Sequence, residues 1–306
     1  MHPLSRRYLF GGLAIDSDVA LAGMRAAGAG SGSHPVRLAF HNGPAPSADR
    51  EIFAWDGRYG VRLGALGEAW RFSSKLDGVF IADHAVTRID FFSAETLPSA
   101  AAIDVLTRRV LPRLATATDA LTVHGAALIR GGGAIVMFGR SGAGKSTLTA
   151  ALAQAGWHIA SDDLTMIRPA SGGAMVHSGA TGVCLWADTR EALSLDPARC
   201  LAMPGYEGKL RFEPEDLPGA ESAPIRAMVF LERSGDLAAP RLDRMPIAAA
   251  VREATQQLIA LDPTAPRIDA AHRLLRAMAH VPTVKLTYPS GYASLPRVTD
   301  LLATLV

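Results

Sequence analysis

The chain has 306 residues, which is enough for one large domain or two smaller ones. Hydrophobic residues make up 49% of it and charged residues 20%, a composition that excludes a disordered chain and a collagen-like fibre. The formal net charge of +2 fits neither a dedicated nucleic-acid clamp nor a polybasic membrane binder, so we expect no nucleic-acid partner.

No apolar run reaches the roughly 18 to 20 residues that span a bilayer, so we expect no membrane span. Residues 5–10 have the outline of a twin-arginine export signal, but Asp16 and Asp18 fall in the part that should be apolar. The two cysteines, Cys184 and Cys200, are too few for a disulfide framework. These features together favour a cytoplasmic protein with reduced thiols.

Residues 1–97 are predicted to form a small β-rich module. Its turn residues separate short segments of β-type composition, and residues 26–33 are a linker or loop rich in Gly, Ser and Ala. The segments are 36–40, 51–55, 59–63 and 85–92. We expect a mostly antiparallel sheet with no catalytic constellation of its own.

Residues 98–306 are predicted to form a larger α/β domain. A helix should begin near Ser99 and present Ile103, Leu106, Val110 and Leu114 on one face, and Pro112 should kink or end it. The pattern then alternates strands and helices. The strands are expected at 121–129, 134–138 and 283–288, and the helices at 145–155, 270–279 and from 295.

A phosphate-binding loop follows the apolar strand that ends at Phe138. Gly139-Arg140-Ser141-Gly142-Ala143-Gly144-Lys145-Ser146-Thr147 matches G-x-x-x-x-G-K-[ST] in full, and a helix closed by Gly156 comes next. The glycines let the backbone wrap around phosphates at the positive end of the new helix. Lys145 can reach the β- and γ-phosphates and the Ser146 hydroxyl can bind Mg²⁺, so we expect binding of a nucleoside triphosphate, with ATP and Mg²⁺ as the working pair.

Two adjacent carboxylates, Asp162 and Asp163, lie shortly after this helix. One can hold Mg²⁺, directly or through water, while the other accepts a proton from an attacking hydroxyl. Taken alone, the pair is as well explained by a turn or a helix cap. A competing acidic candidate, Glu232, ends the apolar run 228–231, which we interpret as an ordinary buried strand.

His124 by itself does not indicate a function, and it becomes a candidate site residue only together with these motifs. Val123-His124-Gly125-Ala126, the phosphate loop and the run from Gly156 to Asp163 occur in that order. Together they resemble the catalytic core of HPr kinase/phosphorylase, whose fold is related to the nucleotide-binding part of phosphoenolpyruvate carboxykinases. The resemblance implies a P-loop kinase domain at 98–306. In it, Asp163 is the base toward an acceptor serine, His124 lies beside the phosphates, Lys145 contacts the transferring phosphoryl group, and Ser146 and Asp162 face the metal.

The sequence also departs from that family. The region 182–188 lacks the glutamate of the family's Glu-Ile-Arg-Gly signature, and Asp188 there is better explained as a helix-start cap. This puts the phosphorylase reaction, and HPr itself as substrate, in doubt. Lys209 and Arg211 could contact phosphate or an acidic acceptor, or be solvated charges on a loop. The layout is more similar to stand-alone HPr-kinase-like proteins, some of which phosphorylate a lasso-peptide precursor on its C-terminal serine.

Three functions remain open at this point. The first is a serine kinase that acts on a peptide or small protein, with a homo-oligomer allowed by the resemblance. The second is a nucleotide-hydrolysing switch in which Asp163 activates water. The third is a non-catalytic nucleotide-binding module that recruits a partner.

Overall fold

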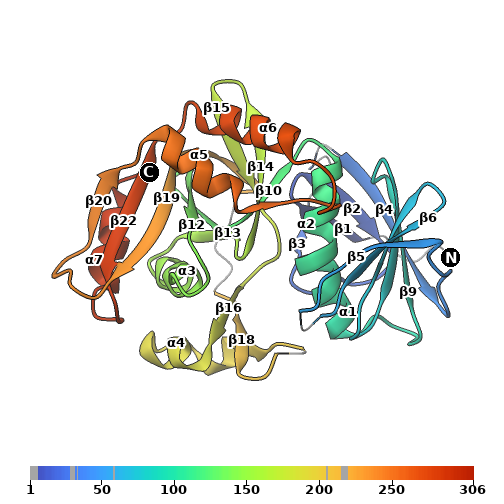
Figure 1. Cartoon of the computed structure of the whole chain (residues 1–306). Coiled ribbons are helices and arrows are strands. Elements are labelled where there is room, and N and C mark those ends of the chain that lie inside the picture. The colour runs from blue at the N-terminus through green and yellow to red at the C-terminus, as the bar shows by residue number, and fades with distance from the viewer. Residues whose placement is uncertain (1–5, 28–31, 33, 58, 205, 215–219) are drawn as a thin grey trace.

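The computed structural model describes residues 6–27, 32, 34–57, 59–204, 206–214 and 220–306. The chain is a mixed α/β protein in which two large sheets lie on either side of a short helical segment (Figure 1). None of the helices in these ranges is both long and apolar enough to span a bilayer.

Within the described ranges, the first sheet has nine strands in the order β3-β1-β2-β4-β9-β8-β7-β6-β5. Only the pairs β2–β4 and β4–β9 are parallel, so the prediction of a mostly antiparallel sheet is confirmed. Its strands are β1 (Arg6–Phe10), β2 (Leu13–Ser17), β3 (Arg25–Ala26), β4 (His34–Asn42), β5 (Arg50–Ala54), β6 (Arg62–Leu66), β7 (Ala69–Ser73), β8 (Val79–Asp83) and β9 (Arg88–Ser93).

Some predicted boundaries in this sheet are wrong. The strand expected at 59–63 begins only at Arg62, and the one expected at 85–92 begins at Arg88, because Val86 has a positive φ in the turn after β8. The hairpin β1–β2, whose turn is Gly11-Gly12, was not predicted. Of the linker expected at 26–33, positions 28–31 and 33 lie outside the described residues.

A helical segment follows, with its N-cap at Ser99 as predicted. It runs as α1 (Ala100–Val105), a π-helical turn η1 (Leu106–Val110), α2 (Leu111–Leu114) and a final turn η2 (Ala115–Ala117). Pro112 does not end the helix, which continues to Leu114. Pro112 lies at the start of α2, directly after the π turn, where a missing backbone N–H is tolerated. The buried side chains of α1–α2 share the hydrophobic core of the first sheet.

The second sheet has ten strands among the described residues, and its centre is the parallel pair β12–β19. The strand predicted at 121–129 is two strands that break at Gly125, because β10 pairs with β14 whereas β11 pairs with β12. The strands are β10 (Leu121–His124), β11 (Ala126–Arg130), β12 (Gly133–Phe138), β13 (His158–Ser161), β14 (Leu164–Ala170), β15 (Gly173–His177), β19 (Ser222–Ser234), β20 (Arg241–Arg244), β21 (Leu258–Ile259) and β22 (Thr283–Pro289).

Helices cover both faces of this sheet. Alternate side chains of β12 point to opposite faces, so Val136 joins the core under α5 and α6, whereas Ile135 joins the core under α3 and α7. A small sheet of β16, β18 and β17 projects beside α3 with α4 (Figure 1). These elements are α3 (Lys145–Gln154), α5 (Ile247–Thr255), α6 (Ile268–Met278), α7 (Leu295–Ala303), β16 (Val183–Trp186), α4 (Ala187–Ala192), η3 (Pro197–Arg199), β17 (Cys200–Ala202) and β18 (Lys209–Phe212).

Candidate active site

The predicted phosphate loop connects β12 to α3. Gly142 and Gly144 have φ of 80° and 93°, a region that favours glycine, and a Cβ at Gly144 would collide with the Tyr288 hydroxyl. That hydroxyl donates to the Ala143 carbonyl and ties the loop to β22. The N-cap of α3 is Gly144, which has no side chain to accept a hydrogen bond, so the first backbone N–H groups of the helix can bind an anion. The loop therefore fits the phosphates of a nucleotide.

Lys145 is buried at the first position of α3. Its Nζ donates to the Gly139 carbonyl at 2.7 Å, and burial lowers the pKa of the ammonium. The charge thus lies over the loop, where a phosphate would sit. Arg140 and Ser141 are exposed at the rim, and the Thr147 hydroxyl lies 3.3 Å from that of Thr189 in α4.

Ser146 and Asp162, the two residues expected to face a metal ion, lie in contact. The Ser146 hydroxyl donates to Asp162 Oδ1 at 3.3 Å, and the Cys184 N–H donates to Oδ2 at 2.8 Å. Within the described residues no three His, Cys, Asp or Glu side chains gather as a metal site. A hydroxyl and a carboxylate beside a phosphate loop nevertheless fit Mg²⁺, which is usually held by one or two protein groups together with phosphates and water. Ser146 and Asp162 would hold the ion.

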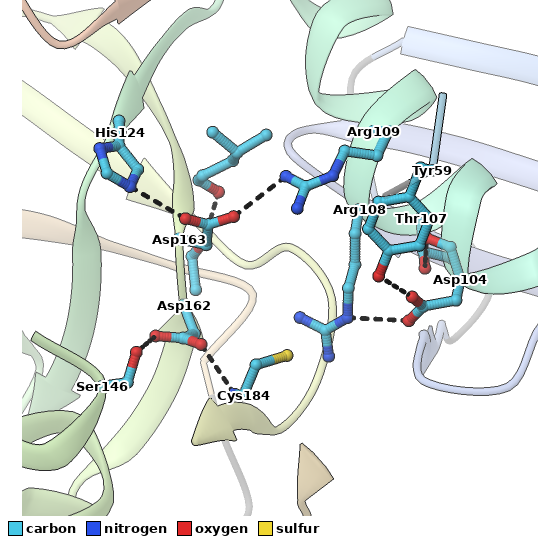
Figure 2. Close-up of polar contacts among 12 residues, drawn as sticks. Tyr59, Asp104, Thr107, Arg108, Arg109, His124, Ser146, Asp162, Asp163 and Cys184 are labelled. Carbon is cyan, nitrogen blue, oxygen red and sulfur yellow. Dashed lines mark hydrogen bonds and ion pairs between the residues drawn. The ribbon is translucent and has the colours of Figure 1, made fainter. Parts of the chain in front are cut away.

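The chain makes a tight turn at Asp162-Asp163. The Leu164 N–H donates to the Asp162 carbonyl at 3.0 Å, and Asp163 has φ of 76°. This is the rare, strained form of the γ-turn, and such strain is concentrated at functional sites. Neighbouring side chains on a strand normally point to opposite faces. The turn instead lets both carboxylates face one site (Figure 2).

Asp163 lies between two cationic or hydrogen-bonding partners from different elements. His124 Nε2 is 3.0 Å from Oδ1, and Arg109 Nη1 donates to Oδ2 at 3.1 Å (Figure 2). Burial raises the pKa of Asp163, but the hydrogen bond from His124 and the charge of Arg109 outweigh it, and the net shift is downward. The side chain remains 41% exposed, so the ionised carboxylate is accessible.

His124 ends β10, and Gln257 holds it on the other side. The backbone N–H of His124 donates to the backbone carbonyl of Gln257 at 2.7 Å, and the ring Nδ1 of His124 lies 3.1 Å from Gln257 Oε1. The ring therefore presents Nε2 to Asp163. His124 also lines the cavity of the phosphate loop.

Sequence reasoning missed the arginines of the helical segment. Arg108 donates to Asp104, and Asp104 also accepts a hydrogen bond from Tyr59 (Figure 2). Arg109 reaches the other way, to Asp163. The signal available in the sequence was Asp104-x-x-x-Arg108, an ion pair at i,i+4 spacing within an apolar helix. The π turn that sets the direction of Arg109 has no comparable signature.

Two cavities meet at Asp163. One, of about 280 Å³, is lined by the phosphate loop, His124, Trp186 and Lys209. The other, of about 190 Å³, lies between Asp162, Asp163 and the helical segment, with Arg109 on its wall. Both cavities include Ser146, Asp163, Cys184 and Lys209 in their linings. A nucleotide and a second reactant could therefore approach Asp163 from opposite sides.

The remaining predicted residues take different places. Lys209 and Arg211 lie on strand β18 rather than on a loop; Lys209 lines both cavities, whereas Arg211 pairs with Glu213 at 2.9 Å. Asp188 lies in the first turn of α4 and accepts the Thr189 N–H rather than serving as the N-cap. Glu232 belongs to β19, as the interpretation of that run as a strand predicted, and pairs with Lys285.

No family model matches the chain, and no curated protein matches it in sequence. Among solved structures, the HPr(Ser) kinase/phosphatase from Coxiella burnetii aligns over 60% of this chain and 88% of its own. Identity is 12% and the TM-score is 0.32. A TM-score this low supports no conclusion about activity, so a functional assignment has to rest on the site itself.

Proposed function

We propose that this chain is an ATP- and Mg²⁺-dependent serine kinase that acts on a peptide or small protein. The position of Asp163 carries the proposal. Its carboxylate lies where the cavity of the phosphate loop meets a second cavity, and His124 and Arg109 hold it from either side. Phosphoryl transfer needs this arrangement, because an acceptor hydroxyl must lie in line between its base and the γ-phosphate.

The two neighbouring carboxylates suit different tasks in this reaction. Burial and the charge of Asp163 raise the pKa of Asp162 to about 6, whereas Asp163 has a lowered pKa. Environments that drive two pKa values apart are typical of sites that divide acid–base work. Asp163 is ionised at neutral pH and can accept the proton of the hydroxyl. Asp162, together with Ser146, is the group to face Mg²⁺.

In the transfer itself, the serine O–H bond breaks and its proton passes to Asp163. The serine oxygen forms a bond to the γ-phosphorus as the bond from that phosphorus to the β–γ bridging oxygen breaks, and ADP leaves. Lys145 balances charge on the phosphates, His124 and Arg109 keep Asp163 in place, and the backbone N–H groups at the start of α3 hold the phosphates. Bound Mg²⁺ would neutralise the phosphate oxygens and orient them.

The proposal extends to a finer assignment. The acceptor is the C-terminal serine of a lasso-peptide precursor, the domain boundary lies between residues 97 and 98, and the enzyme works in the cytoplasm. The choice of acceptor rests on the similar layout of stand-alone HPr-kinase-like proteins, and the boundary and the location rest on the sequence pattern. The resemblance of the motifs also allows a homo-oligomer.

Mass spectrometry of candidate acceptors tests the proposal. The protein is incubated with ATP, Mg²⁺ and a panel containing HPr and short precursor peptides encoded beside the gene, with Asp163→Asn as control. Phosphate on a peptide serine that is absent with the control supports the kinase. Steady release of free phosphate without any phosphoserine would instead support the nucleotide-hydrolysing switch. Tight ATP binding without turnover would support a non-catalytic module.

A further inference from the structure

A third cavity lies beyond the wall of the second one. It has a volume of about 420 Å³ and opens against β5 and the helical segment, where Phe53, Trp55 and Arg113 line it. It shares Tyr59, Arg109 and Tyr206 with the cavity at Asp163. We call this aromatic third cavity the outer groove. The shared side chains make it the outward continuation of the space in front of Asp163.

Arg113 is the unusual feature of the outer groove. Arg113 is only 8% exposed, and its guanidinium stacks on the Trp55 ring, 4.3 Å from the ring centroid. Nη1 donates to the Arg109 carbonyl at 2.7 Å, but Nε is buried and has no hydrogen-bond partner among the described residues. Burial, and secondarily the charge of Arg109, lower the pKa of Arg113 to about 10, and the charge of Asp163 opposes them in part.

The neighbouring arginines differ from Arg113 in having acidic partners. Arg108 pairs with Asp104 and Arg109 with Asp163, whereas in the described part of the chain no carboxylate forms an ion pair with Arg113. A buried cation is costly when no described carboxylate lies at ion-pair distance, and the charge of Asp163 offsets only part of that cost. An anion that entered the groove would relieve more of it. Stacking on an aromatic ring uses the flat face of a guanidinium, so the N–H groups along its edge can still donate to a carboxylate.

We propose that the outer groove selects acceptors that carry a carboxylate close to the serine, with Arg113 as the group that binds it. The inference rests on the proposed kinase function and names its substrate class. Arg109, which contacts Asp163, and Arg113 are four residues apart in the helical segment, and both side chains line the outer groove. A carboxylate on Arg113 would therefore belong to the serine residue itself or to a close neighbour. The aromatic walls would pack the adjoining side chains.

Two chemical sources of that carboxylate can be distinguished with degenerate peptides. A library of octapeptides is prepared with one serine, either at the C-terminus or internal, and each set is made with a free C-terminal acid and with an amide. After incubation with ATP and Mg²⁺, phosphopeptides are sequenced. Enrichment of the free-acid set with C-terminal serine identifies the chain terminus as the ligand. Enrichment of Asp or Glu next to an internal serine identifies a side chain.

Kinetics on the best peptide then test Arg113 itself. Loss of the carboxylate from the peptide should reduce kcat/KM of the wild type about 10- to 100-fold, the effect of a charge-assisted hydrogen bond. Arg113→Gln should show the same reduction with the carboxylate peptide, and little further change with the neutral one. Arg113→Lys should recover part of the preference. Arg276→Gln, an exposed arginine of α6, is the matched control.

The outcomes separate this inference from the function on which it rests. Phosphopeptides that form equally well with and without a carboxylate would overturn the inference and leave the kinase intact. The absence of phosphopeptide from every set would refute both. If Arg113→Gln does not fold, as its melting curve and ATP binding would reveal, the wild-type comparison of acid and amide peptides still decides the question.

Discussion

Arg109 Nη1 donates to Asp163 Oδ2 at 3.1 Å although 54 residues separate them in the chain. The contact links the helical segment that packs on the first sheet to the turn between β13 and β14 of the second. The contact therefore connects the two halves of the fold and fixes the orientation of the Asp163 carboxylate. We regard Arg109 as a positioning residue, because it acts through Asp163.

Replacing Arg109 tests this role. We expect Arg109→Gln to lower kcat about 10- to 100-fold, because the carboxylate loses one of its two restraints and a small displacement of a base is costly. The ATP dissociation constant, measured by titration calorimetry, should not change, since Arg109 does not line the cavity of the phosphate loop. Arg109→Lys keeps the charge and should recover part of the rate. An unchanged kcat in Arg109→Gln would contradict the assignment.

Asp163 is tested by a substitution that its backbone tolerates. Asn is enriched at positive φ, so Asp163→Asn should retain the turn with its φ of 76°. We expect transfer to fall about 10²- to 10⁴-fold, as for loss of a general base, while ATP binding persists. Asp163→Ala adds backbone strain and should also lower the melting temperature. A wild-type rate of phosphoryl transfer in Asp163→Asn would refute the assignment of Asp163 as the base.

Lys145→Ala separates the phosphate site from the acceptor site. Removal of the ammonium from the phosphate loop should abolish ATP binding or transfer, because the Lys145 charge lies at the Gly139 carbonyl, where it can reach the phosphates. Binding of a fluorescent ATP analogue and the phosphopeptide assay report the two effects separately. The control is Lys285→Ala, whose charge pairs with Glu232. Wild-type binding and transfer in Lys145→Ala would exclude the predicted role of the loop.

Asp162 gives a pH-dependent prediction. Its pKa is about 6 in the fold against 3.8 in the unfolded chain, so the folded protein binds the proton more tightly. The stability that this group contributes is fully present below pH 3.8 and is lost as the pH rises through about 6. Asp162→Asn cannot ionise. Without Mg²⁺, the stability of Asp162→Asn relative to that of the wild type should therefore increase between pH 4 and pH 8 by up to about 3 kcal/mol. Melting temperatures of the two proteins across this pH range measure the difference. A difference in melting temperature between the two proteins that does not change with pH would contradict a raised pKa for Asp162.

The phosphate loop, the acidic pair and the strand–helix order around them could be read from the sequence. Each depends on residues close together in the chain: glycines 142 and 144 set the loop, and residues 135–138 and 145–154 fix the strand and helix on either side. Local backbone preference and side-chain periodicity encode such features directly.

Tertiary structure alone decided which partners Asp163 has. The direction of Arg109 depends on a π turn and on the packing of the helical segment, and His124 reaches Asp163 because β10 pairs with β14 across Gly125. The sequence also predicted that Pro112 would kink or end the helix, whereas the helix passes through a π turn just before Pro112 and runs on to Leu114. Contacts between residues distant in the chain depend on burial and pairing of whole elements, and a single sequence has no local signal for them.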